Sequence, residues 1–329
     1  MPANLTPEYL EAERNYRAAK TPEEKLQLLE YMLSVIPKHK GTEKLQSDLK
    51  KKIAKFSAEG AKKGAASRRG SMFNISREGA GQVALTGAPN AGKSSILDLL
   101  TNARPEVADY PFTTIKPQPG MLEYDNIKIQ LVDLPPVSPD WFENWVAGII
   151  RNADLALLVV NLASDTVLEE NEFVIQRLSE AKLHLVEKVN QRFHPDGSAE
   201  IKTRMVFTHA DHPDAPEVLD LFREALGDQF PSLMVSLADP AGTRPLADFI
   251  FESLEIVRVY TKSPGKPPDF ADPVTLPRGA TVMDFAINIH KDLARNLKFA
   301  RIWGNNKYDG QKVPRDYLLM DQDVVELRD

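Results

Sequence analysis

The segment Gly87-Ala88-Pro89-Asn90-Ala91-Gly92-Lys93-Ser94 matches the pattern G-x-x-x-x-G-K-[ST] of a phosphate-binding loop, or P-loop. An apolar run precedes it at 82–86, and residues 95–100 have helical spacing. The pattern predicts a strand, a glycine-rich loop and a helix, with the loop N–H groups and the helix N-terminus directed at phosphate oxygens. We expect the loop and Ser95 to bind a nucleoside triphosphate, Lys93 to contact its β- and γ-phosphates, and Ser94 to bind Mg²⁺. The alternative is a glycine-rich turn with no ligand.

The composition indicates an intracellular protein with more than one domain. The chain has 329 residues, which is typical of about two domains. It contains no cysteine, which excludes disulfides, zinc-thiolate sites and thiol catalysis. The start of the sequence lacks the features of a signal peptide, so we expect a cytoplasmic location. The net charge is −6, yet residues 38–70 hold eleven Lys and Arg against three Asp and Glu, which favours an anionic partner there.

We divide the chain into four regions: a helical arm at 1–57, a basic flexible linker at 58–81, an α/β domain at 82–254 and a C-terminal domain at 255–329. The arm contains a capping box at Thr21-Pro22-Glu23-Glu24, followed by a helix with an apolar face. A second helix carries apolar residues on one side and lysines largely off it. The basic candidates for an RNA contact are Lys50, Lys51, Lys52, Lys55, Lys62 and Lys63.

The α/β domain is predicted from alternating strand and helix patterns. Strands are expected at 83–85, 127–132, 155–160, 205–207 and 233–235, and helices at 141–150, 167–189, 215–226 and 245–254. Such alternation gives a mainly parallel sheet covered by helices on both faces. Ligands bind such sheets at the carboxyl ends of the strands, where the P-loop lies.

The residues that read the base are predicted at Thr208-His209-Ala210-Asp211, which is close to the N/T-K-x-D motif of GTPases. The Asp211 carboxylate can accept two hydrogen bonds from guanine and neither from adenine. His209 takes the place of the usual lysine and is expected to stack on the base. Ser236 and Leu237 resemble, more weakly, the element that meets the guanine oxygen. A metal site at His209 and His212 is the less favoured alternative, because no H-E-x-x-H or cysteine supports it.

The chain resembles a known family over about 82–329. The runs Pro89–Ser94, Asp109–Pro117 with Gly120, and Val132–Pro135 are similar to the Obg/HflX group of translation-factor-related GTPases. The C-terminal runs are similar to the TGS domain of the developmentally regulated GTP-binding proteins (DRG); they are Val259–Lys262, Leu276–Val282, Ile289–Leu293, Ile302–Gly304 and Asp321–Glu326. This resemblance implies a P-loop GTPase domain, a basic helical arm, and a small β-grasp domain that contacts RNA or ribosomal partners.

The resemblance also implies roles for individual residues. Thr114 matches the switch-I threonine that completes the Mg²⁺ shell, with Thr113 as the second choice, and Asp133 matches the aspartate that holds Mg²⁺ through water. Asn90 matches a P-loop asparagine that helps to hold K⁺. The chain departs from the family at Pro136, which stands where the D-x-x-G motif has a glycine whose N–H meets the γ-phosphate.

These observations predict a slow, Mg²⁺-dependent GTPase that acts with the ribosome, tRNA or other RNA. Its catalytic residues would be Lys93, Thr114 and Asn90, and its cofactors GTP or GDP, Mg²⁺ and K⁺. The alternative is a nucleotide-binding RNA or ribosome adaptor in which Pro136 disables the switch. A P-loop ATPase or kinase is the third reading, and Asp211 argues against it.

Overall fold

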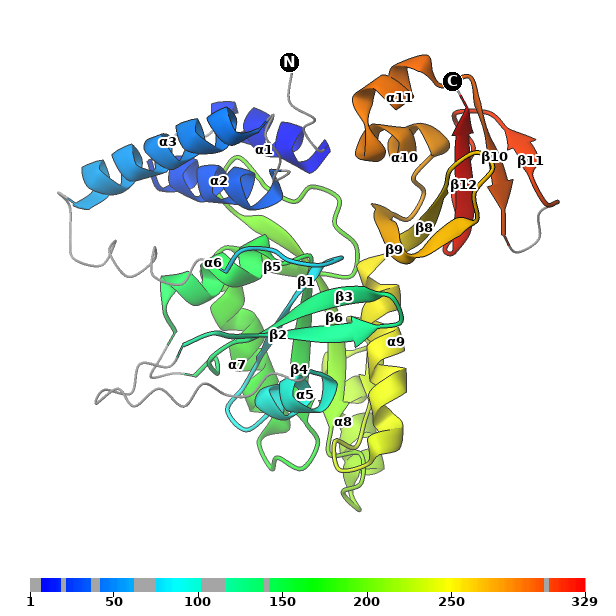
Figure 1. Ribbon diagram of the computed structural model, residues 1–329. Helices are drawn as coiled ribbons and strands as arrows, with labels where there is room; N and C mark the ends of the chain where they lie inside the picture. The colour runs from blue at the N-terminus through cyan, green and yellow to red at the C-terminus, as the bar shows by residue number, and fades with distance from the viewer. Residues whose placement is uncertain are drawn as a thin grey trace. The chain divides into compact units, whose positions relative to one another are not determined.

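The computed structural model describes residues 7–18, 22–36, 42–61, 75–101, 116–138, 142–304 and 308–328 (Figure 1). The chain forms two compact units. The larger unit contains residues 5–122 and 129–249, and the C-terminal unit contains residues 250–329 together with 123–128. No helix in the described ranges combines the length and apolar character needed to cross a membrane.

The larger unit is built on a seven-stranded sheet. Its strands are β1 (Gln82–Gly87), β2 (Gln118–Tyr124), β3 (Ile127–Asp133), β4 (Leu155–Asn161), β5 (Leu183–Val186), β6 (Ala199–Thr208) and β7 (Ser232–Met234). The order is β2-β3-β1-β4-β6-β5, and β7 also pairs with β6. The pairs β1–β3, β1–β4, β4–β6, β5–β6 and β6–β7 are parallel, so the carboxyl ends of β1, β3, β4 and β6 lie at one edge of the sheet.

Helices cover both faces of this sheet. They are α5 (Lys93–Leu100), α6 (Asn144–Asn152), α7 (Val167–Glu180), α8 (Ala215–Leu226) and α9 (Thr243–Leu254), with a short 3₁₀ turn, η1, at Pro240–Gly242. Ala84 and Leu158 pack in one hydrophobic cluster with residues of α6, α7 and α8. Val83 and Leu157 are equally buried, and because successive strand residues point to opposite faces, they lie on the other side. The predicted mainly parallel α/β fold is confirmed.

One predicted helix is wrong in its length. The expected helix at 167–189 ends at Glu180, and Leu183–Val186 forms β5 beside β6. The chain reverses at Lys182, whose φ is 62°, a left-handed conformation that ends a helix. A lysine carries no signal for this conformation. The strand β2 was also not predicted, whereas α8 spans the expected residues.

The larger unit also contains the N-terminal helices α1 (Pro7–Ala18), α2 (Pro22–Val35) and α3 (Glu43–Ala61). Leu29 and Leu49 are buried in the same cluster as the helices of the sheet. The Tyr31 ring of α2 meets the Phe193 ring edge-on, with 5.0 Å between centroids. The helix α3 continues into the predicted linker as far as Ala61, and residues 62–74 of that linker lie outside the described residues.

The C-terminal unit has a mixed five-stranded sheet in the order β11-β10-β12-β8-β9. Its elements are β8 (Ile256–Lys262), β9 (Pro268–Pro277), α10 (Val282–Ile289), α11 (Lys291–Asn296), β10 (Phe299–Trp303), β11 (Gln311–Val313) and β12 (Asp323–Arg328). The strands β8 and β12 are parallel and the other pairs antiparallel. Thr281 and Asp284 form a capping box that starts α10, whose Phe285 is buried against the sheet. The predicted β-grasp fold is confirmed.

Candidate nucleotide-binding site

The P-loop leaves the carboxyl end of β1, between β3 and β4. Gly87 ends this strand with a φ of 148°, and a Cβ at this position would lie 2.3 Å from the backbone oxygen of Val159. Gly92 has a φ of 98° immediately before α5, and a Cβ there would lie 3.2 Å from the side chains of Thr208 and Leu237. Both glycines are therefore required by the path of the loop, and the second lies beside the residues predicted to read the base.

The Lys93 ammonium is buried inside the loop, with 6% of the residue exposed. It donates hydrogen bonds to the carbonyl oxygens of Ala88, at 2.7 Å, and Gly87, at 3.2 Å. Burial lowers the pKa of Lys93 to about 8, and the nearby Asp133 carboxylate opposes this change. A buried cation held mainly by neutral carbonyls gains from an anion placed beside it, so the loop suits a phosphate group.

Ser94 and Asp133 come together at the start of α5. The Ser94 hydroxyl donates to Asp133 Oδ2 at 2.6 Å, while Asp133 Oδ1 is buried with no hydrogen-bond partner among the described residues. Burial raises the pKa of Asp133. A hydroxyl and a carboxylate with a spare oxygen are the ligands that Mg²⁺ prefers, so these residues fit the predicted ion. Thr114 and Thr113 lie outside the described residues.

The segment after Asp133 lies against β1. The N–H of Leu134 donates to Leu85 O at 3.3 Å, and the N–H of Val137 donates to Gly87 O at 3.0 Å. Pro136 lies between them and has no N–H. The first N–H group after Pro136 is therefore already bonded to the P-loop backbone in this structure.

The residues predicted to read the base are brought to the same edge of the sheet. The Thr208 hydroxyl donates to Ala91 O of the P-loop at 2.9 Å, and His209 Nδ1 lies 3.1 Å from that hydroxyl. Asp211 is exposed, and a hydrogen bond from the Ser236 side chain is the main cause that lowers its pKa, which keeps the carboxylate charged. The loops that carry Asp211 and Ser236 are joined by the bond from Ala210 N to Val235 O, at 3.2 Å.

The structure adds one residue to the site that sequence reasoning missed, Asn161. Asn161 ends the apolar strand β4 beside the P-loop; its Nδ2 donates to Asn90 O at 3.3 Å, and its Oδ1 accepts from Ala163 N at 2.8 Å. The signal in the sequence that could have identified Asn161 is a polar residue at the end of an apolar strand.

The alternative of a metal site at His209 and His212 has no support in the structure. Within the described ranges, no group of three or more His, Asp or Glu is placed to hold a metal.

Sequence comparisons with known families and proteins agree with a nucleotide-binding P-loop domain. The model of the "50S ribosome-binding GTPase" family matches residues 82–191, and the TGS domain model matches residues 257–329. An uncharacterized GTP-binding protein of Methanocaldococcus jannaschii is 31% identical over 93% of this chain and 92% of its own length. The developmentally-regulated GTP-binding protein 2 of Homo sapiens is 27% identical over 92% of this chain and 98% of its own length. Among solved structures, the G domain of the T. maritima FeoB iron transporter is 25% identical, with a TM-score of 0.36, and covers 52% of this chain and 97% of that one.

Proposed function

Because the chain belongs to the developmentally regulated GTP-binding protein family, with a P-loop GTPase domain and a C-terminal TGS domain, it binds GTP, and we propose that it is a slow Mg²⁺-dependent GTPase acting on RNA or the ribosome. The observation that carries the enzymatic part is the cluster of Lys93, Ser94 and Asp133 at the phosphate end of the P-loop. These residues supply a buried cation and a pair of oxygen ligands where the β- and γ-phosphates would bind.

Each of these side chains has a role in hydrolysis. Lys93, which donates to its own loop carbonyls in this structure, would neutralise charge on the phosphate oxygens. Ser94 and Asp133 would hold Mg²⁺, which when bound withdraws charge from the β- and γ-phosphates. Asn90 is an exposed residue of the same P-loop with a φ of 56°, and we assign it to a K⁺ ion that adds a further positive charge.

Two residues support the proposed slow rate: Pro136, which removes an N–H donor from the switch, and Val137, which follows it. Val137 occupies the position at which Ras-like GTPases carry the glutamine that orients the attacking water. Its side chain is apolar and only 1% of the residue is exposed. Val137 therefore cannot orient a water molecule through a hydrogen bond, and positioning of water falls to the backbone or to a bound partner.

A fluorescence titration with GTP, GDP and ATP tests base choice. We expect GTP to bind at least about tenfold more tightly than ATP, a difference of about 1.4 kcal/mol, and Asp211→Asn to erase the preference. The matched control is Asp214→Asn, which removes an exposed carboxylate three residues away at the start of α8. Equal affinity for ATP and GTP in the unaltered protein would contradict the assignment.

Release of phosphate from GTP then tests the reaction itself. We expect turnover that requires Mg²⁺, stops with a chelator and rises when K⁺ replaces Na⁺. The second candidate function, an adaptor that binds GTP without hydrolysing it, is favoured by Pro136, which removes one N–H donor from the switch. Tight GTP binding with no phosphate release in K⁺ and Mg²⁺ would support that candidate instead.

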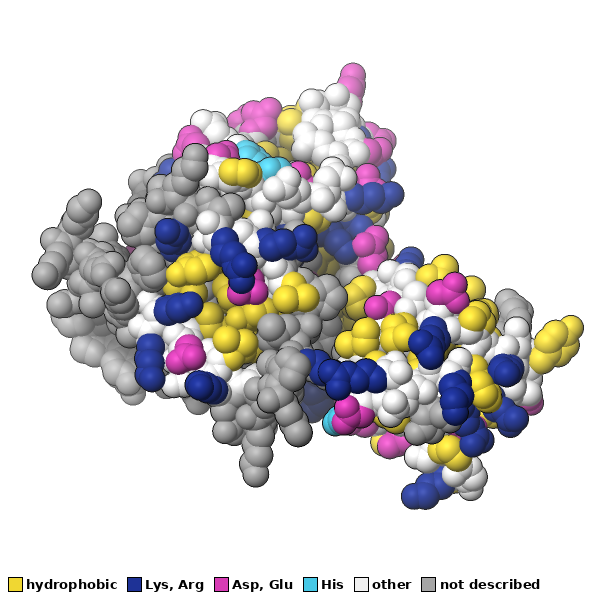
Figure 2. All heavy atoms as spheres, turned by 90° about the horizontal axis from the view of Figure 1, so that it is seen from above, with side chains coloured by type: hydrophobic (Ala, Val, Ile, Leu, Met, Phe, Trp, Pro, Cys, Tyr) yellow, Lys and Arg dark blue, Asp and Glu magenta, His cyan; other side chains and the backbone are white. Residues whose placement is uncertain are grey.

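The proposed RNA contact rests on the exposed face of α3. Lys50, Lys51 and Lys52 are exposed, whereas Leu49 on the same helix is buried. Figure 2, which looks down on the N-terminal helices, shows Lys and Arg side chains around a group of hydrophobic ones. Exposed lysines of this kind suit contacts with RNA phosphates. Of the other predicted contacts, the side chain of Lys55 and all of Lys62 and Lys63 lie outside the described residues.

A further inference from the structure

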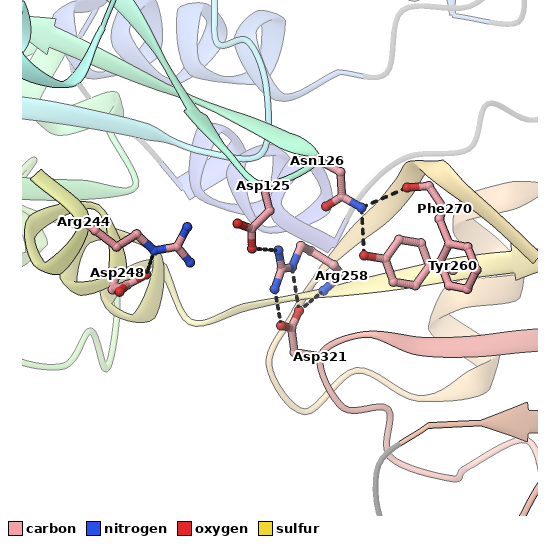
Figure 3. A network of polar contacts seen from close by, with 8 residues as sticks. All are labelled: Asp125, Asn126, Arg244, Asp248, Arg258, Tyr260, Phe270 and Asp321. Carbon is pink, nitrogen blue, oxygen red and sulfur yellow. Dashed lines mark hydrogen bonds and ion pairs between the residues drawn. The ribbon is translucent and has the colours of Figure 1, made fainter.

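The turn of the β2–β3 hairpin, Asp125-Asn126, belongs to the C-terminal unit, although most of the two strands belongs to the larger unit. Asp125 has a left-handed backbone with a φ of 50°. Its side chain and that of Asn126 point at residues that follow more than 130 positions later in the chain (Figure 3).

Arg258 of β8 holds the first residue of this turn. Its guanidinium donates from Nη1 to Asp125 Oδ2 at 2.8 Å, and from Nη2 and Nε to the two oxygens of Asp321 at 2.7 and 3.1 Å. The Arg258 side chain is only 4% exposed. The hydrogen bonds to Asp321, and then the one to Asp125, raise the pKa of Arg258. The guanidinium therefore stays charged. A buried guanidinium bonded to two carboxylates is a strong and geometrically specific contact.

The second residue of the turn and an aromatic stack complete the contact. Asn126 Nδ2 donates to the Tyr260 hydroxyl at 2.7 Å and to Phe270 O at 3.0 Å. Tyr124, the last residue of β2, stacks on Phe251 with 4.5 Å between ring centroids and 17° between planes. Every residue from 124 to 126 thus has a specific partner in 250–329.

The same hairpin connects the two predicted switch segments. The strand β2 follows the segment that contains Thr114, and β3 ends at Asp133, the carboxylate assigned to Mg²⁺. β3 runs without interruption from the turn to Asp133, a distance of about 23 Å for seven residues of strand. It pairs with β1 through residues 130–133, so movement of the strand along β1 would move Asp133 relative to the P-loop.

We propose that Arg258 is a positioning residue for Asp133: by holding the Asp125-Asn126 turn, it fixes the strand that carries the Mg²⁺ carboxylate and couples the C-terminal unit to the nucleotide site. This inference rests on the proposed function. Because coupling between two sites is reciprocal, nucleotide binding must in turn change the stability of the contact between the turn and β8. A partner bound to the C-terminal unit would therefore alter nucleotide affinity.

The test uses the full chain with Asp125→Asn, which removes the charge facing Arg258. Asparagine tolerates the left-handed backbone, so the turn is kept. A second variant, Tyr260→Phe, removes the acceptor of Asn126 and keeps the ring. The matched control is Glu123→Gln, on the same hairpin. Among the ion pairs of the described residues, the Glu123 carboxylate takes part in one, with the exposed Lys128 at 3.3 Å.

Two readouts are measured: GTP affinity by fluorescence, and amide hydrogen exchange in β3 and β8 with and without a GTP analogue. In the unaltered protein, we expect the analogue to slow exchange in both strands. In Asp125→Asn and Tyr260→Phe, we expect the response in β8 to be lost and the dissociation constant for GTP to rise about fivefold or more. Glu123→Gln is expected to behave like the unaltered protein. A general loss of hairpin stability on substitution would instead change this variant as well.

The failing outcomes are separable. If Asp125→Asn and Tyr260→Phe keep the affinity and the β8 response of Glu123→Gln, the coupling is overturned while the proposed function stands. If the unaltered protein binds no GTP, the proposed function is overturned and this inference with it, and that result is seen before any variant is made.

Discussion

At the scale of single residues, the site depends on backbone positions that only glycine can occupy. Gly87 combines a left-handed φ with a backbone oxygen from β4 where a side chain would begin. The constraint comes from the neighbouring strand and is present without nucleotide. Gly87 therefore contributes to the stability of the sheet as well as to the phosphate cradle.

We predict that Gly87→Ala destabilises the larger unit by about 3 kcal/mol and abolishes GTP binding, because the methyl group must displace the backbone of Val159. Gly148→Ala is the control, since Gly148 lies inside α6 with nothing within 4 Å of an added Cβ. That change should be neutral or stabilising by up to about 1 kcal/mol. Unfolding in denaturant compares the two, and equal stabilities would contradict the strain assigned to Gly87.

At the scale of elements, α2 carries an acidic residue that opposes its packing. Burial raises the pKa of Glu30 from 4.5 to about 7. The folded state therefore binds more protons than the unfolded state between these two values, and stability falls as the pH rises through this window. Below pH 4.5 both states are protonated, and above pH 7 the full cost of the buried carboxylate is present.

We predict that Glu30→Gln raises the thermal midpoint at pH 8 and leaves it nearly unchanged at pH 4.5. The gain is at most about 3 kcal/mol, because each pKa unit corresponds to about 1.4 kcal/mol and the partly buried side chain is screened by solvent. Asp48→Asn, at an exposed position of α3, is the control. Thermal unfolding at several pH values between 4.5 and 8 measures the difference, and parallel curves for the two variants would disprove the role of Glu30.

The segment at 134–137, which contains Pro136, is expected to affect the preference for GTP over GDP. Pro136 removes one hydrogen bond to the γ-phosphate, and a charge-assisted bond of this kind contributes about 1.5 to 3 kcal/mol. We predict that GTP and GDP affinities lie close together in the unaltered protein and that Pro136→Gly increases the preference for GTP. Competition titrations measure both. A preference for GTP of about a hundredfold in the unaltered protein would mean that another donor replaces the glycine.

At the scale of the whole molecule, the proposed RNA surface and the nucleotide site are formed by different elements. The RNA surface lies on α3, and the nucleotide site lies at the carboxyl ends of β1, β3 and β6. We predict that RNA association weakens steeply with salt, because phosphate contacts release counterions. Reversing the charges of Lys50, Lys51 and Lys52 should flatten that salt dependence and leave GTP affinity unchanged. Binding measured between low and physiological salt tests this, and association that ignores salt would place the contact elsewhere.

Local patterns were sufficient to predict the P-loop and the helix α8, because loop glycines and apolar spacing constrain the backbone directly. The T-H-x-D segment stays a prediction for base reading, and its Thr208 contacts the P-loop. The strand β5 was missed because the reversal at Lys182 has no local signal. The contact between Arg258 and Asp125 joins residues 133 positions apart, so no pattern within one segment contains it. Ser236 was only weakly indicated as a residue that meets the base, and its hydrogen bond to Asp211 was not predicted, since it depends on two loops meeting at one edge of the sheet.

The membership of residues 123–128 in the C-terminal unit has a practical meaning for protein engineering. A chimera that moves only residues 250–329 of this chain into a related protein would place them against a foreign turn, and would leave Arg258 without its second carboxylate, Asp125. A transplant that also carries residues 123–128 preserves the stack of Tyr124 on Phe251 and the ion pair of Asp125 with Arg258. The C-terminal domain of this chain is therefore portable only as a discontinuous module.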